Sequence, residues 1–533
     1  MSTTQPPGSD TAKVEIDPEV FERRWKILAV LCTSLMVVIV GNTALNVALP
    51  TLARELNASI SAQQWMVDAY GLVFAGLLLT AGTIGDRFGR KGTLQAGLTV
   101  FLSGSLFAAF SHSASAIIVG RAVMGLGAAF VMPATLSILT NVFPPHERGK
   151  AIAIWAGISG GGAAVGPVAS GFLLEHFSWG SVFLVNVPII AFALAAGYVL
   201  LPKSRDPHPE ALDPIGALLS IAGLGSLVYA IIEAPDRGWG SGTSLLWFGI
   251  AAVLIVAFLT WELRNTAPML NLRYFLDPRF GVAAGVITLV FFGMFGFFFL
   301  LTQYFQLVLG YGTLEAGVKQ LPFAAVMMVV APNSPKFAAR FGANIAVAVG
   351  LIGVSSGMFL FTIAHTNTPY IQIVLVVMVM AAGMAMCIPT MTGSIMSAVP
   401  LGKAGVGSAM NDTTRELGGA LGVAVLGSLV ASRYDARLSP ALDLLPASLH
   451  AQAGESLAGA LHTAADVGGP TGTQVAGIAR EAFVSGMHLA AVIAGCVALL
   501  AAAIVYRKLP AGNPHATGAA TLTRESPEVL AEH

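Results

Sequence analysis

The strongest constraint on the fold is a series of long apolar runs, each about 20 residues or more, which is the length that a helix needs to cross a bilayer. Lipid offers no partner to free backbone N–H and C=O groups, so each run must form a helix or part of a closed barrel. The runs are continuous rather than alternating, which favours helices. We predict fourteen spans, at residues 27–50, 64–84, 93–112, 115–140, 150–174, 181–201, 214–232, 243–262, 281–303, 315–335, 344–364, 369–396, 404–430 and 483–506.

Composition excludes several classes of protein. Hydrophobic residues make up 55% of the 533 residues and charged residues 11%, whereas soluble proteins carry about 25% charged residues. Lys+Arg and Asp+Glu both number 28, so no nucleic-acid partner is expected. The three cysteines form neither a disulfide framework nor a metal site. The sequence also lacks a GxxxxGK[ST] phosphate loop and HExxH, so we predict no enzyme activity, no cofactor and no metal, and a gradient as the energy source.

The distribution of basic residues orients the spans. Of the 28 Lys and Arg residues, five lie on the predicted outer side, three lie within spans and the other twenty lie on the inner side. Because cytoplasmic loops are enriched in Lys and Arg, this bias predicts a multi-pass protein of the plasma (inner) membrane with both termini in the cytoplasm. The first 26 residues have no early apolar run and do not resemble a signal peptide. The outer residues are Arg54, Arg237, Arg433, Arg437 and Arg480, and those within spans are Arg121, Lys319 and Arg415.

An internal repeat divides the chain. Glycines and prolines of residues 115–171 recur at an offset of 256 in residues 371–427, and Arg87-Phe88-Gly89 recurs as Arg340-Phe341-Gly342. Coincidence in a glycine-rich chain is the alternative. The repeat predicts an all-α membrane protein of 14 transmembrane helices, with two six-helix pseudo-symmetric halves and a two-helix insertion. The segments are a cytoplasmic tail (1–26), the N-terminal half (27–201), a linker (202–213), the insertion (214–262), the C-terminal half (281–506) with an outer loop (431–482), and a cytoplasmic tail (507–533).

The loop between the second and third spans carries a glycine-rich basic motif, in which glycines permit a tight turn and close helix packing. Asp86 can pair with Arg87 or Arg90, or cap a neighbouring helix. The motif resembles the loop signature GxxxDRxGRK of the major facilitator superfamily; an ordinary basic loop is the alternative. We assign it to conformational gating, through Gly82, Gly85, Asp86, Arg87, Gly89 and Arg90.

Three further motifs resemble those of the fourteen-span multidrug–proton antiporters of this superfamily. In the fifth span, Gly162, Gly166, Pro167 and Gly171 resemble the GxxxGPxxGG signature and are assigned to gating, although a plain packing face is also possible. Arg121 in the fourth span resembles the motif of the proton-coupled members; it could instead extend toward the lipid headgroups. The first span ends in Asn42-Thr43-Ala44-Leu45-Asn46-Val47-Ala48-Leu49-Pro50, similar to LDxTxxNVALP, but Gly41 stands where the family has Asp.

Carboxylates within spans supply candidates for coupling. Asp68 lies in the second span, and Asp412, Arg415 and Glu416 lie in the thirteenth, where Asp412 and Glu416 share a helix face. A low-dielectric environment favours the neutral form of an acid, so a proton and an organic cation can compete for one negative charge. We assign Asp68, Asp412, Arg415, Glu416 and Arg121 to proton and substrate coupling. A salt-bridged structural network is the alternative.

Aromatic and polar side chains supply candidates for the substrate cavity, because aromatic faces attract organic cations. We assign this role to Asn42, Asn46, Trp65, Tyr70, Phe295, Phe299 and Gln303. The resemblance implies a monomeric exporter that lies in membrane lipid and exchanges protons for amphipathic, cationic drug-like compounds by alternating access. A dedicated exporter of a metabolite, lipid or siderophore remains an alternative, as does a membrane protein that binds ligand without transport.

Overall fold

The computed structural model describes residues 18–205, 211–266, 268–399 and 404–509. Within these ranges every regular element is a helix, which confirms the predicted all-α membrane fold. Thirteen helices of the described part are long and apolar enough to cross a membrane. The predicted fifth span corresponds to α6 (Pro145–His176), a 32-residue helix that is not among those thirteen. The count of fourteen spans therefore stays a prediction.

The N-terminal part of the chain follows the predicted spans to within a few residues. Its helices are α1 (Pro18–Glu22), α2 (Arg24–Leu56), α3 (Ile60–Phe88), α4 (Arg90–Ala109), α5 (Ala114–Val142), α6, α7 (Ser181–Leu184), α8 (Asn186–Leu200), α9 (Pro214–Arg237) and α10 (Gly242–Arg264). The start of α9 has a clear physical cause, because the Asp213 carboxylate accepts a hydrogen bond from Gly216 N at 2.8 Å and Pro214 occupies the first turn.

The C-terminal part contains two departures from the predicted spans. Its helices are α11 (Pro278–Gln303), α12 (Thr313–Val318), α13 (Leu321–Val330), α14 (Ser334–Phe341), α15 (Ala343–Phe361), α16 (Tyr370–Ala398), α17 (Ala404–Leu442), α18 (His450–Glu455), α19 (Leu457–Val467) and α20 (Gly469–Lys508). The predicted tenth span is divided into α12, α13 and α14, since Pro322, Pro332 and Pro335 interrupt it. Residues 431–482, expected as a loop, are mostly helical because α17 and α20 extend beyond the predicted spans.

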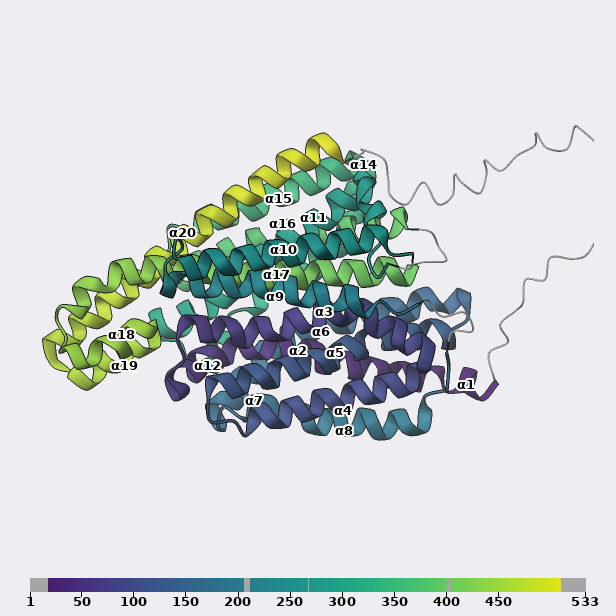
Figure 1. Ribbon diagram of the computed structural model, residues 1–533, viewed down its shortest axis with the longest axis horizontal. Coiled ribbons are helices and arrows are strands. Elements are labelled where there is room, and N and C mark those ends of the chain that lie inside the picture. The colour runs from purple at the N-terminus through teal and green to yellow at the C-terminus, as the bar shows by residue number, and fades with distance from the viewer. Residues whose placement is uncertain (1–17, 206–210, 267, 400–403, 510–533) are drawn as a thin grey trace, which may run out of the picture.

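Helices of the two predicted halves gather in separate regions. Figure 1 shows α2 to α8 in the lower part and α11, α15, α16, α17 and α20 in the upper part. Within the lower part α5 packs on α3 and α4; within the upper part α17 packs on α11 and α20. The two parts meet where α17 packs on α3 and where α12 packs on α6. Helix α10 packs on α9, which contacts both α3 and α17. Helices α18 and α19 project at the end of the bundle opposite α1 (Figure 1).

Several predicted segments lie partly outside the described residues. They are residues 1–17 of the N-terminal tail, 206–210 of the linker, 400–403 before the thirteenth span and 510–533 of the C-terminal tail.

The basic motif forms the junction between α3 and α4. Gly89 adopts φ +116° there, a backbone conformation that L side chains rarely take, and Gly342 adopts φ +95° at the junction between α14 and α15. Of the partners predicted for Asp86, the structure selects Arg90, whose Nε lies 2.7 Å from Oδ1. Ser137 of α5 also donates to the same carboxylate at 3.2 Å. The shared positive φ at Gly89 and Gly342 supports the proposal of two related halves.

A first prediction concerns this junction. Replacing Gly89 by Ala should destabilise the protein by about 1–3 kcal/mol, since the side chain is forced into a strained backbone region. Gly92→Ala is the matched control, because Gly92 lies in α4 with nothing within 4 Å of its added Cβ. Thermal unfolding of the two detergent-solubilised variants compares them directly. Equal midpoints for Gly89→Ala and Gly92→Ala would contradict the prediction.

Candidate functional site

Arg121 is fully buried and joins three helices of the N-terminal part. Its Nη1 donates to Gly41 O at 2.9 Å in α2, its Nε donates to Met66 O at 3.0 Å in α3, and its Nη2 donates to Asn42 Oδ1 at 3.3 Å. The guanidinium also lies 4.3 Å from the centroid of the Tyr70 ring. These contacts place Arg121 inside the bundle rather than toward the lipid headgroups. Among the described residues no carboxylate lies within ion-pair distance of it.

Packing explains why a glycine occupies position 41. A Cβ built at Gly41 would lie 2.7 Å from Cζ of Phe101, which is fully buried in α4. The ring therefore occupies the space that an acidic side chain would need. The backbone oxygen of Gly41 instead binds Arg121, as one of three neutral acceptors that replace an ion pair.

Asp68 is a buried carboxylate with unusual surroundings. It is 1% exposed, and neither oxygen has a hydrogen-bond partner among the described residues. An ionised carboxylate without a partner is costly in such a place, so the neutral form is favoured. Gly71 lies three residues later on the same face of α3, and its built Cβ would lie 3.5 Å from Glu416 Oε2 of α17.

Glu416 therefore approaches α3 from the opposite part of the bundle. Its carboxylate interacts electrostatically with Arg121, Asp412 and Arg415. Among the described residues no ion pair reaches Glu416. The structure thus brings two predicted coupling residues, Arg121 and Glu416, near each other across the contact between α3 and α17. Asp68 lies one turn from Gly71 on α3 and shows no interaction with either of them among the described residues.

Arg415 and Asp412 form a neighbouring polar group on α17. Arg415 Nη1 lies 3.6 Å from Asp412 Oδ1, and its guanidinium lies 5.4 Å from the Phe291 ring centroid. Arg415 Nη2 donates to Thr392 Oγ1 at 3.3 Å. The Asn411 amide, oriented with its oxygen toward Arg415, accepts from Nη2 at 3.2 Å. The sequence analysis missed Asn411 and Thr392; their polarity within apolar runs was the available signal.

The predicted gating glycines of α6 allow close packing on two helices. Gly162 packs on Ile39 and Gly166 on Thr43, both of α2. Gly171 packs on the backbone of α12, since its built Cβ would lie 2.6 Å from Thr313 O. A Cβ at Gly317 of α12 would in turn lie 2.5 Å from Pro167 O. This face of α6 therefore holds α2 on one side and the opposite part of the bundle on the other.

Helix α17 repeats this arrangement at the offset found in the sequence. Gly418 and Gly422 pack on the backbone of α11 at Thr288 and Phe292. Gly427 faces α3, where its built Cβ would lie 3.1 Å from Gln64 Cγ. The counterparts of α2 and α12 are thus α11 and α3, as two parallel repeats require.

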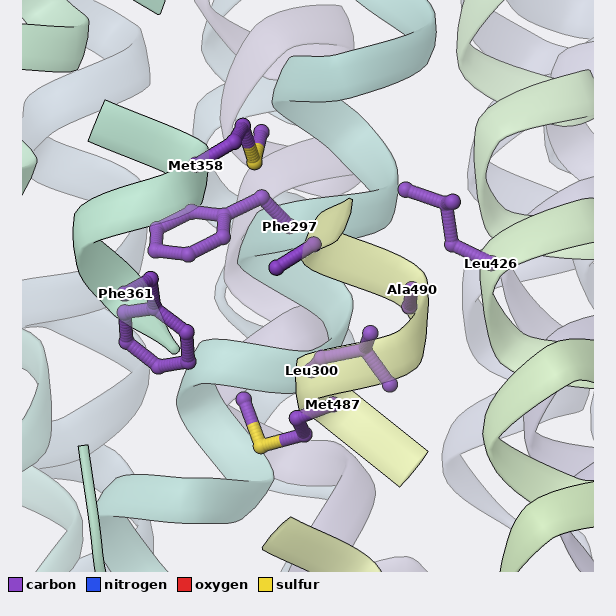
Figure 2. A pocket seen from close by; sticks show the side chains of 8 residues that line it. Phe297, Leu300, Met358, Phe361, Leu426, Met487 and Ala490 are labelled. Carbon is purple, nitrogen blue, oxygen red and sulfur yellow. The ribbon is translucent and has the colours of Figure 1, made fainter. Parts of the chain in front are cut away.

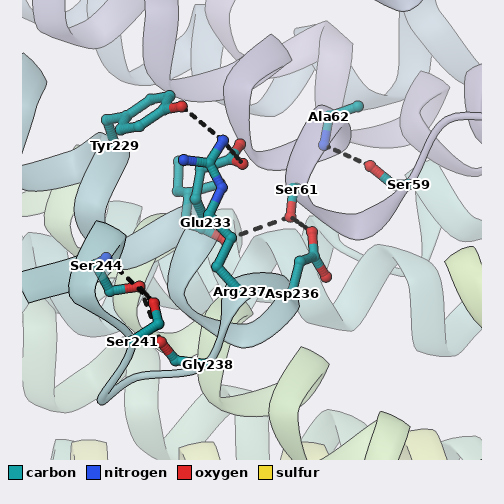
Figure 3. A network of polar contacts seen from close by, with 11 residues as sticks. Ser59, Ser61, Ala62, Tyr229, Glu233, Asp236, Arg237, Gly238, Ser241 and Ser244 are labelled. Carbon is teal, nitrogen blue, oxygen red and sulfur yellow. Dashed lines mark hydrogen bonds and ion pairs between the residues drawn. The ribbon is translucent and has the colours of Figure 1, made fainter. Parts of the chain in front are cut away.

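A polar seam lies where the N-terminal end of α3 meets α17 and α9. Gln64 Nε2 donates to Ala424 O at 2.9 Å and to Val423 O at 3.0 Å. Ser428 donates to Ile231 O of α9 at 2.9 Å, and Ser61 donates to Asp236 Oδ2 at 3.0 Å. Figure 3 shows Ser61 beside Asp236, with Arg237 contacting Glu233 and Tyr229 farther along α9. Sequence reasoning missed Gln64, which is the buried polar residue directly before Trp65.

The remaining predicted gating and cavity residues have varied surroundings. Gly82 faces Pro133, Gly85 faces Thr93, and Arg87 is exposed over the Phe88 ring. Asn46 is half-buried, Trp65 packs against Tyr229, and Tyr70 is fully buried and donates to Val38 O at 3.3 Å. Phe295 packs against Gly419. Phe299 and Gln303, both of α11, are buried, and the Gln303 amide donates a hydrogen bond to Phe299 O.

A separate small pocket lies within the C-terminal part. Apolar side chains of α11, α15, α17 and α20 line it, and Figure 2 shows Phe297, Phe361 and Met358 on one side and Leu426 on the other. None of the predicted site residues lines this pocket, and its lining contains no charged group.

Comparison with known proteins identifies the family. Residues 31–423 match the Major Facilitator Superfamily. The chain belongs to this superfamily. Similar superfamily proteins include the multidrug efflux pump LfrA of Mycolicibacterium smegmatis, which is 37% identical over 91% of this chain and 96% of its own length. The tetracenomycin C resistance and export protein of Streptomyces glaucescens is 33% identical over 90% and 91%. The methyl viologen resistance protein SmvA of Salmonella typhimurium is 32% identical over 90% and 97%.

Solved structures of other superfamily transporters share the fold. A bacterial homologue of the human lysosomal transporter Spinster covers 93% of this chain and 99% of its own, with a TM-score of 0.65 and 16% identity. A D-xylose–proton symporter covers 91% and 98%, with a TM-score of 0.59 and 15% identity. The family and the helices together make this chain a multi-pass membrane protein of a transporter family.

The contacts of Arg121 generate a second prediction. Arg121→Lys should destabilise the protein by about 2 kcal/mol or more, because one ammonium cannot reproduce the three directed bonds of the guanidinium. Asn42→Ala, which removes only the 3.3 Å contact, should cost about 1 kcal/mol. Thermal unfolding in detergent gives both values. A Lys variant no less stable than Asn42→Ala would show that the three-helix junction does not depend on the guanidinium.

Proposed function

We propose that this chain exports amphipathic, cationic compounds across the plasma membrane in exchange for protons, by alternating access of two six-helix halves. The names of its relatives support this: they include a multidrug efflux pump, an export protein for tetracenomycin C and a methyl viologen resistance protein. The predicted arrangement, with the protein monomeric and both termini in the cytoplasm, belongs to the same proposal.

The observation that carries the proposal is the approach of Glu416 of α17 to Gly71 of α3, one turn from the partnerless Asp68. Glu416 thus lies at a contact between the predicted halves, and Asp68 lies one turn away on α3. In alternating access these two helices move relative to each other. A buried acid is stable when protonated, and when ionised it attracts a cation. Proton and cargo then compete for one negative charge, which couples their movements. Arg121, held by neutral acceptors, leaves its positive charge free to influence Glu416.

The polar seam supports a conformation closed at its predicted outer end. Gln64, Ser61 and Ser428 lie near the outer ends of their spans, and their hydrogen bonds join α3, α17 and α9. Gly171 of α6 contacts α12 at the same predicted side. We infer that cargo enters this conformation from the cytoplasmic side, and that release requires these contacts to separate.

A third prediction tests coupling. Glu416→Gln and Asp68→Asn should each abolish drug-driven proton exchange, because neither amide can carry the exchanged proton. The measurement is intravesicular pH in proteoliposomes after addition of an organic cation such as ethidium. Glu175→Gln is the control and should retain exchange, since Glu175 is an exposed acid at the end of α6. Full exchange by both site variants, in protein shown to be folded, would refute the assignment.

A fourth prediction tests alternating access. Cysteines at Gln64 and Gly427 should form a disulfide across the polar seam, because a Cβ at Gly427 would lie 3.1 Å from Gln64 Cγ. The background variant has its native cysteines, Cys32, Cys387 and Cys496, replaced by Ala. Oxidation should reduce transport at least tenfold, and reduction should restore it. Undiminished transport by the fully cross-linked protein would contradict separation at this seam.

A further inference from the structure

A lysine is enclosed by aromatic rings at the predicted outer end of the C-terminal half. Lys319 directly follows α12, and its Nζ lies 4.1 Å from the ring centroids of both Tyr311 and Tyr370. Glu315 Oε1 lies 3.2 Å from the same ammonium. The mechanism proposed above uses none of these four residues.

The rings are held in place by their own contacts. Tyr311 N donates to Phe305 O at 2.9 Å, and the Phe305 ring centroid lies 5.8 Å from that of Tyr311 and 6.4 Å from that of Tyr370. Tyr370 donates its hydroxyl hydrogen to Lys319 O at 2.9 Å. The two tyrosine rings are half-buried and pack against Phe305, which is only 1% exposed.

The ion pair alone does not explain this arrangement. Glu315 and Lys319 are four residues apart, and the Glu315 side chain is 52% exposed, so the pair contributes little to stability. The dominant feature is that the Tyr311 and Tyr370 rings lie at the same distance from the Lys319 ammonium. Two aromatic faces and a carboxylate are also the groups that bind quaternary ammonium compounds.

The position of the site relates it to export. Gly317, two residues before Lys319, packs against Pro167 of α6, so the site adjoins the contact between α12 and α6. Cargo released at the predicted outer side passes near this contact. An ammonium tethered by its own chain competes with free cations as though it were present at millimolar concentration.

We propose that Tyr311, Tyr370 and Glu315 form an organic-cation site at the outer end of the C-terminal half, which the Lys319 ammonium fills as an internal ligand in this conformation. Its ligand class is quaternary ammonium compounds. In this role Lys319 prevents released cations from rebinding from outside. The physiological ligand, though not the binding site itself, rests on the proposed export of cationic compounds.

Equilibrium binding of radiolabelled tetramethylammonium to the detergent-solubilised full chain tests the site. Lys319→Ala should bind the probe at least about tenfold more tightly than the native chain, because the competing ammonium is gone. Lys319→Arg keeps a tethered cation and should resemble the native chain. Adding Tyr311→Ala and Tyr370→Ala to Lys319→Ala should remove the gain, whereas adding Tyr370→Phe should retain it. An unchanged affinity in Lys319→Ala, or a gain that persists without the rings, overturns the proposal.

A second measurement uses the native chain and does not depend on the folding of Lys319→Ala. Acylation of Lys319 by an amine-reactive reagent, read by mass spectrometry, should rise several-fold when tetramethylammonium displaces the ammonium. Acylation that does not respond to the probe overturns the proposal. Both measurements are made without a gradient. A failure to exchange protons would therefore contradict the proposed function but would not contradict this binding site. Conversely, failure of these binding tests leaves the coupling residues untouched.

Discussion

Close backbone contact between small residues is the interaction on which the rest of the structure depends. Helices in lipid gain no hydrophobic energy by associating, so packing and interhelical hydrogen bonds must hold them together. Here the glycines of α6 approach α2 and α12, and those of α17 approach α11 and α3. One helix in each part of the bundle thus packs within its own part through two glycines and contacts the opposite part through a third. Gly171 and Gly427 are those third residues, and they allow α6 to approach α12 and α17 to approach α3 closely.

That distance gives the buried charges their environment. With α3 and α17 in contact, Glu416 reaches Gly71. Asp68, one turn before Gly71, is buried without a hydrogen-bond partner among the described residues. Arg121 is stabilised by two carbonyl oxygens and an amide oxygen rather than by an acid, because Phe101 occupies the space beside Gly41. A guanidinium that is not neutralised can influence an acid across the contact, and an ion-paired one would do so far less. The departure from the family motif at Gly41 therefore changes which carboxylate can respond to Arg121.

The sequence predicted the positions of the helices more reliably than the contacts between them. Apolar run length placed most helix ends within a few residues, because lipid forces each run into a helix. The predicted tenth span lies within Thr313–Phe341, which is long and apolar enough to cross a membrane, but its division into three helices was not predicted. The helical extension of α17 beyond residue 430 was missed because its composition is too polar for lipid. The choice of Arg90 over Arg87 for Asp86 depends on the local turn at Gly89, which the motif alone does not specify. The seam at Gln64 and the rings around Lys319 could not be predicted, since they depend on how helices far apart in the chain pack together.

Two of the contacts between the parts of the bundle, α6 with α12 and α3 with α17, differ in chemistry, and the helices of the predicted insertion lie beside the second. The contact of α6 with α12 is made by glycine and backbone, apart from the bond of Thr313 to Gly171 O. The contact of α3 with α17 carries the Gln64 bonds, and α9 lies over it with hydrogen bonds to Ser61 and Ser428. Separating a glycine contact loses packing that lipid can largely replace, whereas separating the polar seam also breaks the hydrogen bonds of the Gln64 amide and the Ser61 and Ser428 hydroxyls. The predicted insertion therefore lies along the contact that carries more hydrogen bonds, where α9 offers Ser61 and Ser428 acceptors that lie outside both predicted halves.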